Sequence, residues 1–445
     1  MAESARSRPC PRTMRVILTN FGSLGDVQPF VALAVELKRH GHQPVVAAAP
    51  SYGALARHHG LEFAPVGPDL RDAQSGITQA MMGNPAVAHS AGGMLQLFQP
   101  LAEAVPLMLE DLRAACRTAD VLVSGRVQPA ARMVHDLTHL PFVTVLVEHS
   151  GSGGGSPAFQ AAVRGLVNPL RESLRLPPLD NPLVDGLSPQ LVLTALSRHV
   201  RPPASDAPAH HHTVGYCLLD EPDFTPDAKL AAFLAEGDAP VCITFGSMTH
   251  ADSAALTDTL VAAAERSGRR VLIQHGWSGL GQRALPPTAH ALDQVPHAWL
   301  FSRVSCVVHH GGAGTTGAAF RAGVPQVVVP HTYDQFTWGE VVQERGCGGP
   351  AIPIGELSVE RLAAALRAVH ERTDLRATAA RLGEQLREEH GTTKARHHIE
   401  DLVRRVGLAS DPVSGDEGDE DAEDEGRRQR RRSALKQQRA RKVDT

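Results

Sequence analysis

Short apolar runs alternate with helical segments along this chain, and this alternation constrains its fold more than any other feature. Arg15–Thr19 predicts a buried strand, a turn with Gly22 and Gly25 follows it, and residues 29–38 place apolar side chains at helical spacing. A second strand is predicted over residues 44–49. A strand, a helix and a strand joined by short turns form a βαβ unit, and such units build a parallel sheet.

The alternation occurs in two series. Further strands are predicted at residues 121–123, 142–147, 241–245, 271–274, 306–308 and 326–329, and the last four alternate with alanine-rich helices. A length of 445 residues is enough for two domains. We therefore predict an α/β protein with two Rossmann-like, doubly wound domains that face a central cleft at the carboxyl ends of their strands.

Composition marks the boundaries of these domains. We predict a disordered N-terminus at 1–13, a first domain at 14–200, a linker at 201–222, a second domain at 223–390, a C-terminal helix at 391–409 and a disordered acidic and basic tail at 410–445. Met14 directly precedes the first strand and is an alternative start of translation. The triplet His210–His212 could bind a metal ion, but in a proline-rich stretch we expect it to be exposed. The tail either recruits a partner or is simply a solvated extension.

Composition also excludes several classes of protein. The six cysteines are far apart and form no CxxC pair, which argues against a zinc site and against a disulfide framework. No segment stays apolar for the ~18 residues of a membrane span, and residues 1–13 lack the apolar core of a signal peptide. The net charge is −4 and basic residues outside the tail are scattered, so no nucleic-acid partner is expected. We predict a cytoplasmic location.

A glycine-rich turn follows the strand predicted at 306–308. It reads His309-His310-Gly311-Gly312-Ala313-Gly314-Thr315-Thr316 and opens an alanine-rich helix. Glycines let the backbone approach a ligand closely, and the exposed amides and dipole of a helix N-terminus favour an anion. The hydroxyl groups of Thr315 and Thr316 add donors, so a diphosphate is the expected ligand.

The same turn also matches the dinucleotide-binding pattern. Gly312–Gly317 reads GxGxxG, and Asp334 follows at the distance expected of an acid that binds ribose. The match lies deep in the second series, however, and two histidines precede it. We therefore disfavour an NAD-dependent oxidoreductase.

The stretch from Val295 to Trp338 resembles the nucleotide-sugar-binding signature of the UDP-glycosyltransferase superfamily. It contains Pro296-His297, the glycine-rich turn and Asp334-Gln335. The bacterial branch that holds glycopeptide and polyketide antibiotic glycosyltransferases, sterol glucosyltransferases and rhamnosyltransferases is most similar. Residues 21–29 and 245–248 resemble the opening turns of that branch's two domains, and the resemblance spans roughly residues 14–408.

The resemblance implies the glycosyltransferase B fold, with the acceptor bound by the first domain and the donor by the second. It implies that the donor is bound by Ser247, Val295, His309, Gly311, Gly312, Gly314, Thr315, Thr316, Asp334 and Gln335. Val295 would meet the base through its backbone, and Asp334 and Gln335 would bind the sugar hydroxyls. Plant relatives carry a Trp at the position of Gln294 and a Glu at that of Gly317, so UDP- and dTDP-sugars both remain candidates. The nucleotide-sugar is a co-substrate, and neither a cofactor nor a metal ion is expected.

Asp26, in the first turn, is the predicted catalytic base. Relatives carry His or Asp there, and the carboxylate would take the proton of the acceptor hydroxyl during an inverting displacement. Asp26 is equally suited to cap the following helix, and the two roles are compatible. Candidate residues of the acceptor pocket are His149, which precedes a glycine-rich loop, and Met94 and Phe98 in an apolar stretch. Alternatively, that loop is a flexible crossover and that stretch is ordinary core.

Together these features predict a metal-independent inverting glycosyltransferase. It would move a hexose from a UDP- or dTDP-sugar to a hydroxyl of an apolar small molecule, such as a polyketide or glycopeptide aglycone, or alternatively a sterol or glycolipid. A nucleotide-sugar epimerase or a non-catalytic helper on the same fold is the alternative of another class. Peripheral membrane contact, and a monomer or a homodimer, are left open by the sequence.

Overall fold

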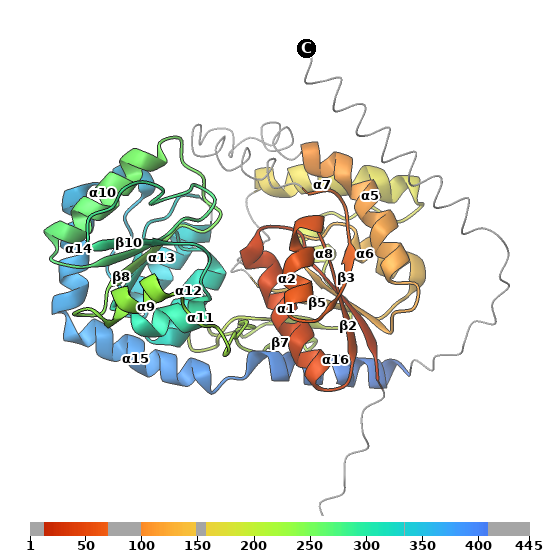
Figure 1. Ribbon diagram of the computed structural model, residues 1–445. Helices are drawn as coiled ribbons and strands as arrows, with labels where there is room; N and C mark the ends of the chain where they lie inside the picture. Colours follow the sequence, from red (N-terminus) through yellow and green to blue (C-terminus); the bar gives the residue numbers. More distant parts are fainter. Residues whose placement is uncertain (1–12, 70–98, 148–156, 333, 408–445) are drawn as a thin grey trace, which may run out of the picture. The chain divides into compact units, whose positions relative to one another are not determined.

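The computed structural model describes residues 13–69, 99–147, 157–332 and 334–407 (Figure 1). The two ends predicted to be disordered, 1–13 and 410–445, lie outside the described residues, except for Thr13. So do three predicted acceptor-pocket residues, Met94, Phe98 and His149.

The first half of the chain is built on a seven-stranded parallel sheet. Its strands are β1 (Arg15–Thr19), β2 (Gln43–Ala48), β3 (Glu62–Pro65), β4 (Val121–Gly125), β5 (Phe142–Leu146), β6 (Val192–Thr194) and β7 (His211–Thr213). Their order in the sheet is β3-β2-β1-β4-β5-β6-β7, and every pairing is parallel. This order reverses direction between β1 and β4, which is the doubly wound arrangement that the sequence predicts.

The central strands of this sheet, β1, β4 and β5, are buried on both faces because helices cover both. On β1, Val16 and Leu18 pack into one buried cluster and Ile17 into the other. The helices of the first half are α1 (Leu24–Arg39), α2 (Gly53–His58), α5 (Gln99–Ala115), α6 (Ala131–Thr138), α7 (Pro157–Ser173) and α8 (Pro182–Asp185), with a 3₁₀ turn at Pro50–Tyr52. Helix α1 contributes to the cluster of Val16 and Leu18, whereas α5, α6 and α7 contribute to that of Ile17. Burial on both faces is typical of parallel sheets.

The second half is built on a five-stranded parallel sheet. Its strands are β8 (Val241–Thr244), β9 (Val271–Gln274), β10 (Ala289–Leu292), β11 (Cys306–His309) and β12 (Gln326–Val328), in the order β10-β9-β8-β11-β12. The helices are α9 (Ala228–Ala235), α10 (Ser253–Arg266), α11 (His297–Leu300), α12 (Ala313–Ala322), α13 (Asp334–Glu344), α14 (Val359–Glu371) and α15 (Thr373–Arg387), with 3₁₀ turns at Phe301–Arg303 and Ile354–Glu356. Side chains of β8 again alternate between two clusters, since Ile243 joins one and Cys242 the other.

The last helix, α16 (Gly391–Val406), follows the second half in sequence but packs on α1 of the first (Figure 1). Its residues Ala395, Ile399 and Leu402 belong to the buried cluster of the first sheet. A buried polar network also joins the two helices. Arg396 lies beside Glu36 and Glu400, and Nε2 of His42 lies 3.1 Å from Oε1 of Glu400. The C-terminal helix is therefore part of the first core.

Several elements differ from the sequence-based prediction, among them strands β3, β6 and β10, which were not predicted. Helix α1 begins at Leu24, before the predicted start at Pro29, because Ser23 and Asp26 supply a helix start upstream of the proline. Pro29 has no N–H to donate, so it stands within the helix and leaves the carbonyl of Gly25 without its usual donor. The predicted linker 201–222 contains β7, which pairs with β6 and makes His211 and His212 part of the sheet. Helix α15 was not predicted as a separate element.

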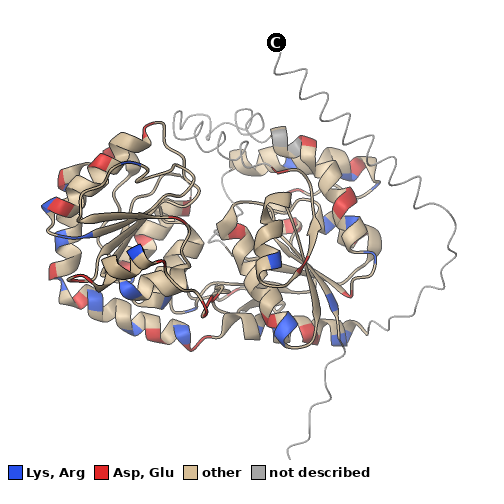
Figure 2. Cartoon of the chain, viewed as in Figure 1, with Lys and Arg blue, Asp and Glu red and all other residues tan. Residues whose placement is uncertain are grey.

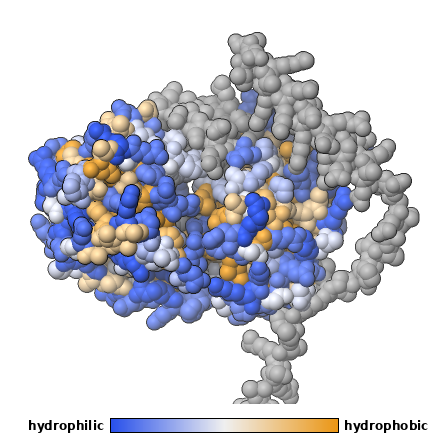
Figure 3. All heavy atoms as spheres, viewed as in Figure 1, coloured by the Kyte–Doolittle hydropathy of each residue, from blue (hydrophilic) through white to orange (hydrophobic). Residues whose placement is uncertain are grey.

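The surface of the described residues is mixed in character. Acidic and basic side chains are interspersed on the helices of both halves (Figure 2). Hydrophilic residues cover much of the visible face, with smaller hydrophobic areas among them (Figure 3). None of the described helices combines the length and the apolar character that crossing a membrane requires.

Candidate functional site

The turn between β1 and α1 holds the predicted base, Asp26. Ser23 is the N-cap of α1, and Oδ2 of Asp26 accepts hydrogen bonds from the Ser23 backbone N–H at 2.7 Å and from its hydroxyl at 2.9 Å. Gly22 has a φ of +138°, and a Cβ there would lie 2.4 Å from Oδ2 of Asp26. Asp26 is therefore not the N-cap itself, as the alternative interpretation had it, but the third helical residue, whose carboxylate completes a capping box with Ser23. A carboxylate has two oxygens and about four acceptor positions, so capping does not exclude a role in proton transfer.

Asn20 fixes this turn against the sheet. Its side-chain amide donates to the carbonyl of Asp26 at 2.8 Å, and its Oδ1 accepts from the Phe21 N–H at 2.9 Å. A Cβ at Gly125, on the neighbouring strand β4, would lie 2.1 Å from Oδ1 of Asn20. The backbone therefore comes close to Asn20 from two strands, and the turn that holds Asp26 is rigidly supported.

A cavity of about 240 Å³ opens beside this turn. Most of its wall is apolar and comes from the carboxyl ends of β1 and β4 and from α5, α6 and α7. The lining includes Asp26, Phe21, Leu101, Val105, Phe159 and Val163. None of the three predicted acceptor-pocket residues belongs to the described chain. The predicted acceptor pocket is therefore not tested at these three residues, and the cavity described here lies in the same half of the chain.

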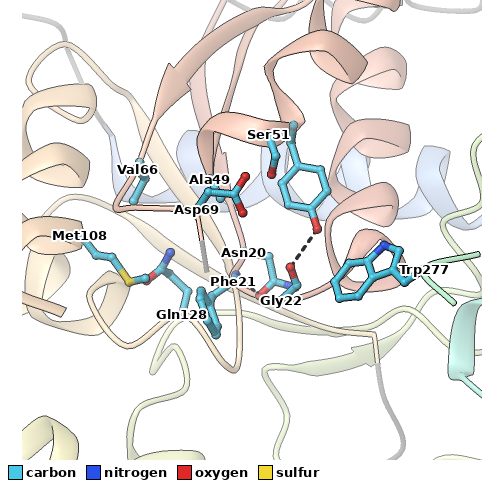
Figure 4. Close-up of a pocket in the computed structure, with 11 residues that line it drawn as sticks. Asn20, Phe21, Gly22, Ala49, Ser51, Val66, Asp69, Met108, Gln128 and Trp277 are labelled. Carbon is cyan, nitrogen blue, oxygen red and sulfur yellow. Dashed lines mark hydrogen bonds between the residues drawn. The ribbon is translucent and has the colours of Figure 1, made fainter. Parts of the chain in front are cut away.

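A second cavity on the same turn is much smaller. It measures about 10 Å³ and is lined by Asn20, Phe21, Gly22, Gln128 and Met108, among others (Figure 4). The hydroxyl of Tyr52 donates to the Gly22 carbonyl at 3.0 Å beside it. A space of this size holds one water molecule at most, so the larger cavity is the candidate for an organic ligand.

The glycine-rich turn in the second half leads from β11 into α12, as the sequence predicts. Gly311 has a φ of +90°, and a Cβ there would lie 2.7 Å from the Gln335 carbonyl oxygen. Gly312 is the N-cap of α12, and no side chain caps that end. The first amides of a helix have no acceptor within it. Gly314 and Thr315 lie in this first turn, where their amides can bind an anion.

Two predicted donor-binding residues bond within the protein instead. His309 is fully buried; its Nδ1 accepts the Gly311 N–H at 3.1 Å, and its Nε2 lies 2.8 Å from Oε1 of Gln326. Burial lowers the pKa of His309 to about 3, so the ring is neutral. The hydroxyl of Thr316 donates to the Gly312 carbonyl at 2.9 Å. Both side chains shape the turn, and their direct contact with the donor stays a prediction.

His310 is a functional candidate that sequence reasoning did not select. It is 8% exposed, and within the described part of the chain its Nδ1 has no hydrogen-bond partner. Burial lowers its pKa to about 4. A Cβ at Gly312 would lie 2.4 Å from its Nε2, and one at Gly246 would lie 3.2 Å from its Cε1. The ring therefore stands between the α12 turn and the β8 turn. Glycines on both sides were the signal available in the sequence.

The other predicted donor residues surround this point. Ser247 follows Gly246 in the turn after β8, where Gly246 has a φ of +54°. The backbone carbonyl of Val295 accepts from the side-chain amide of Gln274 at 3.2 Å. Oε1 of that glutamine lies 3.1 Å from Nε2 of His297. The predicted base-binding backbone is therefore held in place by a buried glutamine.

Asp334 and Gln335 form the start of α13. Oε1 of Gln335 accepts the N–H groups of His331 at 2.8 Å and Thr332 at 3.1 Å. Its amide nitrogen lies 3.4 Å from Sδ of Met248, next to Ser247. The glutamine thus joins the loop before α13 to the β8 turn, and its predicted contact with a sugar is not tested by this arrangement.

The described residues contain no group of three or more His, Cys, Asp or Glu side chains arranged to hold a metal ion. The triplet His210–His212, which the sequence left open as a metal site, therefore forms no such group. Instead, the ring of His212 stacks on that of His398 of α16, with 4.2 Å between their centroids.

Two family profiles match the chain. The N-terminal domain of glycosyltransferase family 28 matches residues 16–131, and the C-terminal domain of erythromycin biosynthesis protein CIII-like matches residues 258–401. The sterol 3-beta-glucosyltransferase of Neosartorya fischeri is 31% identical over 86% of this chain and 29% of its own length. UGT80A2, a sterol 3-beta-glucosyltransferase of Arabidopsis thaliana, is 30% identical over 86% of this chain and 64% of its own length. The chain belongs to the UDP-glycosyltransferase superfamily.

This member of the UDP-glycosyltransferase superfamily spans only part of those relatives, about a third of the fungal protein and two thirds of the plant one. Solved structures show the same fold over most of the chain. The glycosyltransferase of kitacinnamycin covers 88% of it with a TM-score of 0.69 and 22% identity, and is itself matched over 100%. The calicheamicin glycosyltransferase CalG4 covers 89% with a TM-score of 0.68 and 20% identity, also over 100% of its length. The predicted glycosyltransferase B fold is confirmed.

Proposed function

We propose that this protein is an inverting glycosyltransferase that needs no metal ion. It moves a hexose from a UDP- or dTDP-sugar to a hydroxyl of an apolar small molecule. The observation that carries the proposal is the cavity of about 240 Å³ in the first half, because its apolar wall includes the carboxylate of Asp26. An apolar site with one convergent charged group is suited to an apolar alcohol whose hydroxyl must lose a proton.

The second half supplies the donor site in this proposal. The uncapped N-terminus of α12 offers backbone amides to the diphosphate, and Gly312 and Gly314 let it approach closely. We assign the neighbouring contact to His310 rather than His309, because both ring nitrogens of His309 bond within the protein, whereas the ring of His310 stands between the turns of Gly246 and Gly312. The helix N-terminus would also stabilise the charge that develops on the leaving diphosphate.

Asp26 is the base in this reaction. The acceptor oxygen attacks the anomeric carbon, its proton passes to the carboxylate of Asp26, and the bond between the anomeric carbon and the diphosphate oxygen breaks. A single displacement of this kind inverts the anomeric configuration. The bonds from Ser23 hold the carboxylate in one orientation, so no reorganisation is needed at the moment of transfer.

For the acceptor we place a sterol-like polycyclic alcohol ahead of a polyketide or glycopeptide aglycone. The relatives at 30–31% identity are sterol 3-beta-glucosyltransferases. The antibiotic glycosyltransferases are similar in fold at 20–22% identity. A rigid polycyclic alcohol also suits a cavity lined by Phe21, Leu101 and Phe159.

The proposal is tested by product analysis. The purified protein is incubated with UDP- or dTDP-glucose and a panel of sterols and macrolide aglycones, and the glycoside and free nucleotide are quantified. We expect a β-glycoside from an α-linked donor, formed equally with and without a chelator. Donor converted to free sugar or an epimer without acceptor would point to the alternative class, a hydrolase or an epimerase. No turnover with any acceptor, together with no donor binding, would refute the proposal.

Asp26→Asn tests the base. The amide keeps an oxygen that can accept from Ser23, so the cap is retained while the proton acceptor is lost. We expect turnover to fall by about 10²–10⁴-fold. Ser23→Ala is the matched control, since it removes a hydrogen bond to Asp26 and keeps the carboxylate. Turnover of Asp26→Asn above about a tenth of the wild-type value would show that Asp26 only caps α1.

A further inference from the structure

Charged side chains, most of them basic, interrupt the apolar wall of the acceptor cavity. Three arginines line it, Arg126, Arg132 and Arg171, and the one acidic residue in the lining is Asp26. Arg171 lies on α7 and is 1% exposed, whereas Arg132 on α6 keeps 23% of its side chain accessible. A guanidinium buried in an apolar wall is costly unless its charge is balanced.

Arg132 and Arg171 share a single carboxylate, that of Asp136. Nε of Arg132 donates to Oδ1 of Asp136 at 2.8 Å, and Nη1 of Arg171 lies 2.9 Å from Oδ2. The angles of the second contact are not those of a hydrogen bond, so it is an ion pair only. Among the described residues, two cations thus face one anion, and this part of the wall keeps one excess positive charge.

The remaining donors of these arginines are only partly used. Nε of Arg171 donates to the Pro177 carbonyl at 2.8 Å, and Nη1 of Arg132 donates to the carbonyls of Asp185 at 2.9 Å and Leu187 at 2.8 Å. Within the described chain, Nη1 of Arg171 is buried without a hydrogen-bond acceptor. An arginine offers five N–H donors in a planar fork that matches the two oxygens of a carboxylate.

We propose that the acceptor is a hydroxy acid: an apolar alcohol that also carries a carboxylate, which Arg171 binds inside the cavity. The carboxylate would balance the excess charge and accept the unused N–H groups of Arg171. Asp26 lies on the turn after β1, and Arg171 lies on α7, so the two charged groups come from different parts of the wall. Repulsion from Asp26 and attraction to Arg171 would orient the acceptor with its hydroxyl toward the base.

This inference rests on the proposed function for the identity of the cavity, but its test does not need turnover. The probes are a 3β-hydroxysteroid with a side-chain carboxylate, its methyl ester and the corresponding side-chain alcohol. Their dissociation constants are measured by calorimetry on the full chain without donor. We expect the acid to bind about 10- to 100-fold more tightly than the ester, as for a hydrogen bond to a charged group.

Arg171→Met tests the residue. It leaves Arg132 and Asp136 as a balanced pair, so the fold should be retained. The preference for the acid over the ester should fall to about one, whereas Arg164→Met, an exposed change on the same helix, should leave it intact. Circular dichroism, at 25 °C and through thermal unfolding, checks that both variants are folded.

Equal binding of the acid and the ester to the wild type would refute the inference, and so would a preference that survives Arg171→Met. Tight binding of the ester and the acid alike, with weak binding of the alcohol, would show that a neutral carbonyl is recognised and would also refute it. If the acid binds through Arg171 but no glycoside forms from any donor, the proposed function fails and only the carboxylate site at Arg171 stands. If neutral sterols are glycosylated and the acid is not preferred, only this inference fails.

Discussion

Acidification should destabilise the second half well before its carboxylates protonate. Three buried histidines cluster there, His309, His310 and His331, and burial is the main reason that their pKa values fall to about 3, 4 and 3. Their neighbouring imidazoles lower them further. The hydrogen bonds also require a neutral His309 ring, because its Nδ1 can accept the Gly311 N–H only when it carries no proton.

The magnitude follows from the difference between folded and unfolded pKa values. The unfolded chain takes up a proton at each histidine near pH 6.5, whereas the folded chain does not until its lower pKa is reached. Stability is therefore fully present above pH 6.5 and is lost as the pH falls below it. At pH 5 each ring costs about 2 kcal/mol, and the three together about 6 kcal/mol as an upper bound, since they interact. That is comparable with the whole stability of a typical domain.

The assay uses the tryptophans. All three, Trp277, Trp299 and Trp338, lie in the second half, and Trp338 is fully buried. Denaturant unfolding followed by their fluorescence, at constant ionic strength between pH 7.5 and pH 5, should give a free energy that is flat above pH 6.5 and then falls. The slope should approach at least four protons, because burial also lowers the pKa of His297 in the same half to about 4.

Two variants test whether these buried histidines cause the loss of stability at low pH. His309→Asn should lower stability at pH 7.5 and reduce the slope by about one proton, because one titrating ring is gone. His58→Asn, a change at a side chain of the first half that is 68% exposed, is the matched control. A free energy of unfolding that stays constant from pH 6.5 to pH 5 would refute the reasoning.

Three further outcomes are expected. Ser23→Ala should lower the free energy of unfolding by about 0.5–2 kcal/mol while turnover stays within a few-fold, and a loss of turnover like that of Asp26→Asn would contradict the separate roles. Gly312→Ala would place a Cβ 2.4 Å from Nε2 of His310, so affinity for UDP or dTDP should fall at least about 10-fold by calorimetry, unlike in Gly349→Ala, where nothing lies within 4 Å. Arg396→Met would leave two buried carboxylates without their cation and should cost about 3–5 kcal/mol by chemical unfolding, whereas a cost near zero would show that the network is not stabilising.

Eight of the twelve described strands were predictable because each is a short, largely apolar run that is mostly buried. Val271–Gln274 matches β9 at both ends, and Arg15–Thr19 matches β1. Strand β7 was not predictable in this way, since His211-His212-Thr213 has no apolar pattern and pairs only because β6 offers an open edge. Pro29 misled the prediction of α1, because a proline usually marks the first turn and here stands deeper in the helix.

The site was predicted at the level of its turns and less well at the level of its side chains. Asp26 and the α12 turn lie where the sequence indicates, since strand–turn–helix order fixes them. The sequence could not show which of the two adjacent histidines, His309 or His310, bonds within the protein. That depends on Gln326 of the next strand, which bonds His309. The excess charge at Arg171 was also hidden, since α6 and α7 come together only in the folded chain.

The packing of α16, the last helix, against the core of the first half has a consequence for how this protein is synthesised. A ribosome completes the seven strands of the first sheet about 180 residues before it delivers Ala395, Ile399 and Leu402, which belong to the same core. Until α16 is synthesised, the face of α1 that it covers stays exposed, and the nascent first half presents an apolar surface to solvent. A cut between the two sheets would therefore leave the first half without part of its core. A stable first half would need residues 391–406 supplied to it, either on a separate peptide or by a short linker joined after β7.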